Sequence, residues 1–101
     1  MNIDRLVALA VLGWAMLAAW PAQAADNTAR SLAATCTGCH GTNGVSAGGI
    51  PTIAGLEQAR IVTLLQEFRD GKRPSTVMQQ HAKGYTDEQI ELIAAWFAAR
   101  K

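Results

Sequence analysis

The sequence is poor in the residues that build most metal and redox sites, with two cysteines and two histidines among 101 residues. Its formal net charge is only +1, so it lacks the basic surface expected of a protein that binds nucleic acid or acidic membranes. No stretch alternates apolar and polar residues for long enough to predict a strand. No glycine-rich stretch is followed by Gly-Lys-Ser/Thr, which excludes a P-loop nucleotide site. The expected fold is therefore a single all-α domain.

The longest apolar run, Leu6 to Trp20, carries no charge. It is shorter than the roughly 18 to 20 residues that span a bilayer, and small residues follow it at Ala22 and Ala24. This pattern predicts a cleavable secretory signal peptide over residues 1–24 and a mature domain over residues 25–101. The alternative is an uncleaved membrane anchor, which would usually be longer and more strongly flanked by positive charge. We expect a periplasmic protein with no membrane association after cleavage.

Three main helices are expected in the mature domain. The first runs through residues 27–40, where Asp26 can cap its start, and the glycine-rich stretch that follows predicts a loop. The second covers residues 56–70, which place apolar side chains on one face and have Gly71 as the C-terminal cap. Residues 72–84 lack a sustained period and predict a surface loop with at most one turn of helix.

The third helix begins with a clear local signal. Thr86 and Gln89 form a capping box, while Tyr85 and Ile90 form the matching hydrophobic staple. The residues that follow place Ile and Phe side chains on one face, as expected for a helix that packs against a core. A domain of about 77 residues is nevertheless marginal on hydrophobic burial alone, so we expect an internal ligand to complete that core.

The stretch Cys-Thr-Gly-Cys-His holds both cysteines and one of the two histidines within five residues. On a helix, positions i, i+3 and i+4 share a face, so Cys36, Cys39 and His40 would point toward one object. Haem accepts all three, because its two vinyl groups take the cysteine thiols as thioethers and the histidine reaches the iron. This spacing is the signal for c-type haem attachment. It predicts one covalently bound haem c, with His40 as the proximal iron ligand.

The two cysteines have three other interpretations. A haem-free dithiol oxidoreductase would have Cys-x-x-Cys near a βαβ pattern, and no strand is predicted here. Structural zinc needs four ligands, and the mature chain offers only the two cysteines, His40 and His81. A plain disulfide would close too small a loop to stabilise the domain much.

The sixth iron ligand is expected to be Met78, the only methionine of the predicted mature chain. A thioether ligand raises the reduction potential relative to a second imidazole, which suits an electron carrier. The alternatives are that Met78 fills the core and that His81 binds the iron instead. An open sixth position would favour a peroxidase-like haem enzyme over a carrier.

The chain resembles the class I cytochromes c. The resemblance rests on "ATCTGCHG", on "IPTIAGL" after a glycine-rich loop, on "FRDGKRPS" and on "GYTDEQIELIAAWFA", which together cover nearly all of residues 25–100. It implies that the carbonyl of Pro51 orients the imidazole of His40, and that Trp96 and Phe97 pack against the first helix. Ordinary core packing is the alternative for these residues.

The stretch "RPSTVMQQHAKGYTDEQIELIAAWF" is similar to the monohaem cytochrome subunits of flavocytochrome c sulfide dehydrogenases and their free-standing relatives. That similarity implies redox partners: a flavoprotein that oxidises sulfide, and a terminal oxidase or another cytochrome as acceptor. Lys72, Arg73 and Lys83 flank the methionine loop and would steer an acidic partner at low salt, although a purely solubilising role is the favoured interpretation.

Overall fold

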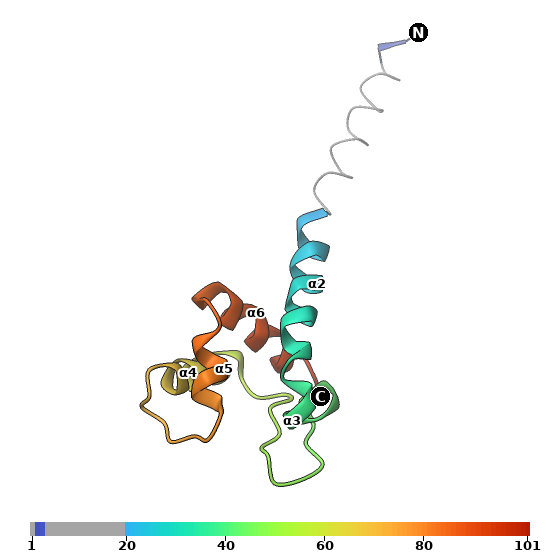
Figure 1. Cartoon of the computed structure of the whole chain (residues 1–101). Coiled ribbons are helices and arrows are strands. Elements are labelled where there is room, and N and C mark those ends of the chain that lie inside the picture. The colour runs from blue at the N-terminus through green and yellow to red at the C-terminus, as the bar shows by residue number, and fades with distance from the viewer. Residues whose placement is uncertain (1, 4–19) are drawn as a thin grey trace.

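A computed structural model describes residues 2–3 and 20–101. Within residues 20–101 every regular element is helical and no strand is present, which confirms the all-α expectation (Figure 1). The α-helices are α2 (Trp20–Ala34), α3 (Thr37–His40), α4 (Gln58–Arg69), α5 (Met78–Lys83) and α6 (Asp87–Ala98), and η1 (Thr42–Gly44) is a 3₁₀ turn. Most of the predicted signal peptide, residues 4–19, lies outside the described residues. None of the described helices combines the length and apolarity needed to cross a membrane.

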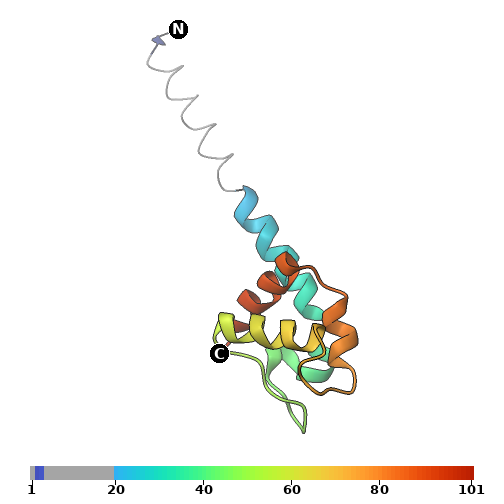
Figure 2. The same cartoon turned by 90° about the vertical axis from the view of Figure 1, so that its left-hand side faces the viewer.

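Helix α2 begins at Trp20, so the prediction that Asp26 caps its start was wrong: Asp26 lies inside the helix. Residues 24–28 are exposed, and this part of α2 projects away from the packed helices (Figures 1 and 2). Ala29 is the first buried residue after this exposed stretch. The packed part of the molecule therefore begins about one turn beyond Asp26.

Helix α6 is the centre of the fold. Its apolar face buries Ile90, Ile93, Ala94 and Phe97 almost completely, and it packs against both α2 and α4. Phe97 belongs to the same buried cluster as Ala33 of α2, and Trp96 packs at the margin of that cluster. The expected capping box is present, because Thr86 Oγ1 accepts from Gln89 N at 3.2 Å and Gln89 Oε1 accepts from Thr86 N at 2.9 Å.

Helices α4 and α5 pack against each other on the other side of α6. Helix α4 ends as predicted, with Gly71 just beyond it at φ 72°. The six-residue helix α5 is longer than the single turn expected in the loop before α6. Its start is supported by Ser75, whose Oγ accepts from Gln79 N at 3.1 Å, and Ala82 anchors it with no exposed surface. Packing against α4 thus makes a helix where the sequence shows no apolar period.

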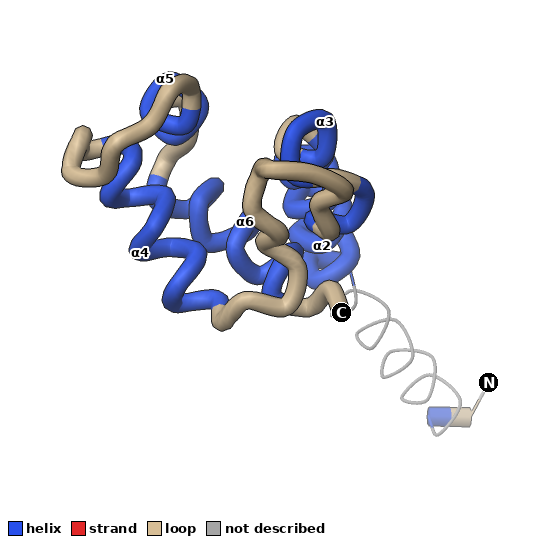
Figure 3. Tube along the Cα trace, turned by 90° about the horizontal axis from the view of Figure 1, so that it is seen from below, coloured by secondary structure: helices blue, strands red, loops and turns tan. Residues whose placement is uncertain are grey.

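Two segments of the chain therefore lie on opposite sides of α6. The attachment segment, residues 20–55, contains α2 and α3; the Met78 segment, residues 56–85, contains α4 and α5. Helix α3 packs on α2 and η1, while α5 packs on α4. Seen from below, α3 and α5 stand apart at the same edge of the molecule, with α6 between the two segments (Figure 3).

Candidate functional site

The Cys-Thr-Gly-Cys-His stretch forms a separate short helix rather than the end of one continuous helix. The chain leaves α2 through a turn at Thr35 and Cys36, and α3 then begins at Thr37. The helical relation between the first cysteine and the histidine survives, because His40 N donates to Cys36 O at 3.0 Å. Positions i and i+4 of such a turn share a face, so the motif presents its side chains on one side.

A tight loop follows His40 and depends on two glycines. Gly41 has φ 89°, and a Cβ placed there would lie 1.9 Å from Val45 O, so only glycine fits. Gly44 has φ 80° and is buried, and a Cβ there would lie 2.7 Å from Phe97 Cδ1. The carbonyl of Gly44 accepts from both Ile53 N and Ala54 N, at 2.9 and 3.1 Å. These bonds fold the chain back and bring residue 51 beside the motif.

The folded-back loop places Pro51 against His40. His40 Nδ1 lies 2.7 Å from Pro51 O. A carbonyl oxygen can only accept, so Nδ1 carries the proton in this bond. In the neutral imidazole this tautomer leaves the other ring nitrogen, Nε2, with its lone pair available to a metal ion. The contact that the proposed role of Pro51 requires is therefore present.

Both cysteines are free thiols, Cys36 half-buried and Cys39 exposed. Burial raises the pKa of the Cys36 thiol, and Thr35 Oγ1 lies 3.8 Å from its sulfur. The raised pKa keeps this sulfur protonated at neutral pH.

Met78 is the first residue of α5 and is half-buried, whereas His81 is exposed on the same helix. The main packing contacts of α5 are with α4 and those of α3 are with α2 and η1. The two helices stand apart at the same edge of the molecule (Figure 3). The structure thus leaves the two expected iron ligands on separate elements, one on either side of α6.

Apolar side chains are left exposed in the loops on both sides of this region. Val45 and Ile50 follow the motif and are 52% and 43% exposed, while Val77 precedes Met78 and is 53% exposed. Monomeric proteins usually cover such residues where they lie together. The free thiols, the unprotonated imidazole nitrogen and these uncovered apolar groups match the needs of a covalently held, largely apolar macrocycle.

The basic residues near Met78 differ in their contacts. Arg73 is bound to the side chain of Glu67, with Nη2 at 2.9 Å and Nε at 3.0 Å from Oε2, and its guanidinium lies 5.8 Å from the Phe68 ring centre. Lys72 and Lys83 are exposed. Arg73 is therefore part of the structure of the loop, and the solvent-facing charge of this loop comes from the two lysines.

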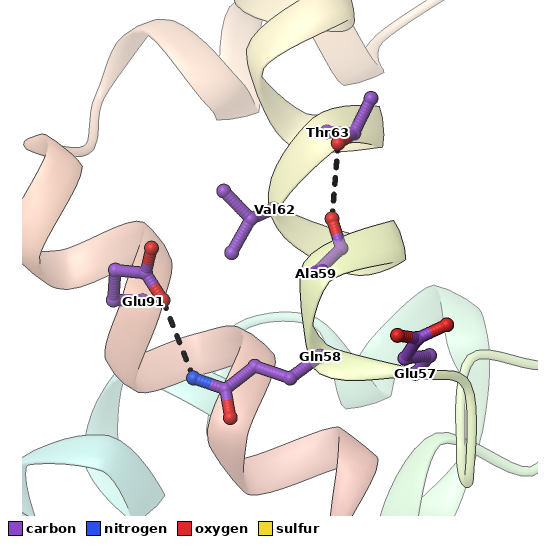
Figure 4. Close-up of a pocket in the computed structure, with 6 residues that line it drawn as sticks. All are labelled: Glu57, Gln58, Ala59, Val62, Thr63 and Glu91. Atoms are coloured by element: carbon purple, nitrogen blue, oxygen red, sulfur yellow. Dashed lines mark hydrogen bonds between the residues drawn. The ribbon is translucent and has the colours of Figure 1, made fainter.

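An open pocket of about 510 Å³ lies between the start of α4 and the middle of α6 (Figure 4). Gln58 Nε2 donates to Glu91 Oε2 at 3.2 Å across it, and the remaining lining residues are Glu57, Ala59, Val62 and Thr63. It contains no residue of the motif and neither expected iron ligand, so it is distinct from the candidate site.

One contact near the motif was not foreseen from the sequence. The Tyr85 hydroxyl lies 2.7 Å from Thr35 Oγ1, next to Cys36. The sequence pattern assigned Tyr85 only to the hydrophobic staple of α6. The two partners are 50 positions apart in the sequence, which carries no local signal of their pairing.

Comparison with known proteins places this geometry in context. The family model described as "Cytochrome c" matches residues 25–100. The chain is 53% identical over 66 residues, 65% of its length, to the "Cytochrome subunit of sulfide dehydrogenase" of Chlorobaculum tepidum. It is 34% identical over 102 residues to the "Thiosulfate dehydrogenase electron acceptor" of Thiomonas intermedia, and 32% identical over 71 residues to "Cytochrome c-554(548)" of Halomonas halodenitrificans. The first match covers 60% of the Chlorobaculum tepidum protein. The match to the Thiomonas intermedia protein covers 96% of this chain and 44% of that protein. The match to the Halomonas halodenitrificans protein covers 66% of this chain and 86% of that protein.

Proposed function

Because the chain belongs to the cytochrome c family, we propose that it is an exported monohaem electron carrier whose iron is held between His40 and Met78. Family membership brings one covalently bound haem c, and a role in electron transfer rather than in an enzymatic reaction. The observation that carries the proposal is the hydrogen bond from His40 Nδ1 to Pro51 O, because it leaves Nε2 ready to bind iron.

Cys36 and Cys39 hold the haem in this proposal. Each S–H adds across one vinyl group, so that a C–S bond forms and the proton ends on the neighbouring carbon, with no external oxidant. The spacing of the two cysteines on one turn fixes the ring relative to α3. The haem supplies an iron that cycles between the ferrous and ferric states.

Met78 is proposed as the distal ligand. It is half-buried at the start of α5, on the side of α6 opposite to the motif, whereas His81 of the same helix is exposed. A thioether ligand favours the ferrous state and raises the reduction potential relative to a bis-histidine iron. Val45, Ile50 and Val77 would cover the ring edge and exclude water from the site.

Export is proposed through cleavage of residues 1–24, which would deliver the chain to the periplasm. Support comes from the exposure of residues 24–28, since packing begins only at Ala29. Removal of the preceding residues would therefore break no described packing of the domain. Attachment of haem by thioethers is also compatible with an oxidising compartment, since it consumes both thiols before they can pair.

The proposed electron donor is a flavoprotein that oxidises sulfide. Support comes from the name and the 53% identity of the relative from Chlorobaculum tepidum, and the match covers 60% of that protein. The relative named as an electron acceptor of thiosulfate dehydrogenase is 34% identical. Sulfide supplied with such a flavoprotein should reduce the ferric haem faster than sulfide alone. An equal rate with and without the flavoprotein would contradict this donor.

The experiment that tests the iron site is an optical spectrum of the matured protein with Met78→Ala, using His81→Ala as the matched control. Wild type should show c-type haem bands and the weak far-red band of a methionine bound to ferric iron. Met78→Ala should lose the far-red band and bind carbon monoxide readily in the ferrous state, while His81→Ala should keep the wild-type spectrum. Retention of the band in Met78→Ala, or its loss in His81→Ala, would overturn the assignment.

A further inference from the structure

Tyr85 makes an unusual connection. It is the only tyrosine of the chain and lies between α5 and α6. Its hydroxyl is 2.7 Å from Thr35 Oγ1. Two of the described hydrogen bonds join the attachment segment to the Met78 segment. One is this long-range bond between Tyr85 and Thr35; the other, from Leu56 N to Ile53 O, joins residues that are close in the sequence. The two segments otherwise meet mainly through their packing on α6.

The direction of this bond follows from the protons available. The hydroxyl of Thr35 has one proton, and its Oγ1 lies 2.8 Å from Leu32 O, which can only accept. Thr35 Oγ1 therefore donates its proton to Leu32 O and accepts a hydrogen bond from the Tyr85 hydroxyl. The same Oγ1 lies 3.8 Å from Cys36 Sγ. Tyr85 is thus tied to the residue that contacts the first haem-attaching sulfur.

The other end of the connection leads to Met78. The backbone N–H of Tyr85 donates to Ala82 O at 3.3 Å, so Tyr85 is fixed to the last turn of α5. Ala82 has no exposed surface and lies four residues after Met78, on the same face of the helix. A short path of bonded groups therefore runs from Cys36 through Thr35 and Tyr85 to the helix that begins with Met78.

We propose that the Tyr85 hydroxyl is a positioning group that sets the distance between the attachment segment and α5, and so holds Met78 on the haem iron. This rests on the Met78 ligation proposed above. Tyr85 touches neither the iron nor the ring in this role and acts through Thr35. Without the bond, α5 gains freedom to move away from the motif, and the equilibrium between methionine-bound and open iron shifts toward the open form.

The test is a titration of the ferric protein with imidazole, followed at the far-red band and in the haem visible spectrum. Imidazole must displace Met78, so its apparent affinity rises by the factor by which methionine binding weakens. Tyr85→Phe and Thr35→Val each remove the bond and should bind imidazole roughly two- to tenfold more tightly than wild type, the range expected for one net hydrogen bond. Because both changes break the same bond, the double variant should bind imidazole no more tightly than either single variant.

Two controls separate positioning from general damage. Thr35→Ser keeps the hydroxyl and should retain the wild-type imidazole affinity. Thr37→Val removes a comparable bond at the same helix junction, from Thr37 Oγ1 to Ala34 O at 2.8 Å, but that bond does not reach the Met78 segment. It too should leave the imidazole affinity unchanged. If Tyr85→Phe fails to mature, Thr35→Val with Thr35→Ser decides the question alone.

The possible failures can be told apart. Wild-type imidazole affinity in Tyr85→Phe or Thr35→Val would overturn the positioning role, as would an equal increase in Thr37→Val. Met78→Ala, measured beside them, should bind imidazole far more tightly than any of these variants. If its affinity equals that of wild type, Met78 is not a ligand and the proposed iron site itself fails.

Discussion

The attachment segment and the Met78 segment are stabilised by different kinds of interaction. The attachment segment is shaped by backbone bonds: Gly44 O holds two amides, and Pro51 O accepts from His40. In the described residues all ion pairs lie between residues 67 and 87, where Arg69 binds Asp87 and Asp70, and Arg73 binds Glu67. Backbone geometry is insensitive to salt, whereas exposed ion pairs are screened by it. The histidine side of the site is therefore rigidly defined, and the methionine side is the adjustable one.

The difference has a functional meaning for an electron carrier. In the proposed site, the proximal ligand and the two sulfurs come from one short stretch, residues 36–40, so α3 would set their geometry. The proposed distal ligand would reach the iron only with the second segment held at the right distance, and α6, the Arg73 ion pair and Tyr85 are the groups placed to do so. Changes in the Met78 segment should consequently alter iron ligation while leaving haem attachment intact.

The largest effect is expected from variants that remove the haem from between the two segments. Cys36→Ala with Cys39→Ala should abolish covalent attachment, so that the mass of the denatured protein falls by one haem. Since α3 packs mainly on α2 and η1, and α5 mainly on α4, we also expect most of the cooperative unfolding transition measured by circular dichroism to disappear. Thr37→Val, in the same turn, should keep both the haem mass and the transition. A double cysteine variant that still carried the haem mass would contradict the attachment site.

The next test strains the attachment segment where it meets α6. Gly44→Ala introduces a side chain at φ 80° and places its Cβ 2.7 Å from Phe97 Cδ1, so the free energy of unfolding should fall by about 1–3 kcal/mol. Gly48→Ala is the matched control, because a Cβ there meets nothing within 4 Å. Denaturant unfolding measures both. Equal stability of the two variants would show that the glycine loop is not held tightly against α6.

The smallest expected effect concerns the Met78 segment. Arg73→Gln removes the ion pair with Glu67 and should lower the free energy of unfolding by about 0.5 kcal/mol at low salt, with less difference in concentrated salt. Lys72→Gln makes the same charge change at an exposed neighbour whose described hydrogen bond, to Glu67 O, is made by its backbone. It should change stability less. A salt-independent loss in Arg73→Gln would instead assign the effect to packing on Phe68.

Local signals in the sequence predicted the parts of the fold that depend on local interactions. The capping box of Thr86 and Gln89 needs only residues three apart, and it correctly predicted the start of α6. Gly71 correctly marked the end of α4. Helix α5 was underestimated because its stability comes from packing on α4, and the start of α2 was misplaced because Asp26 lies inside a longer helix.

The candidate site shows the same difference between features set by local interactions and features set by tertiary packing. The spacing of Cys36, Cys39 and His40 was enough to predict a shared target, and the structure keeps the helical turn that this requires. The nearness of Pro51 to His40 came from family resemblance, since it depends on a loop closed by two glycines. The bond between Tyr85 and Thr35 could not be predicted, because tertiary packing alone brings residues 50 apart in sequence together. Long-range contacts of this kind are needed to place residues of distant segments relative to one another.

The exposed start of α2 has a practical consequence. Residues 24–28 are all exposed and belong to the part of α2 that projects away from the packed helices (Figure 1). A tether placed there, whether a second protein or a linker to an electrode, would disturb none of the described packing. It would also lie away from the Cys36–His40 turn. This stretch of α2 is therefore a suitable point for immobilising the protein on a surface without blocking its redox centre.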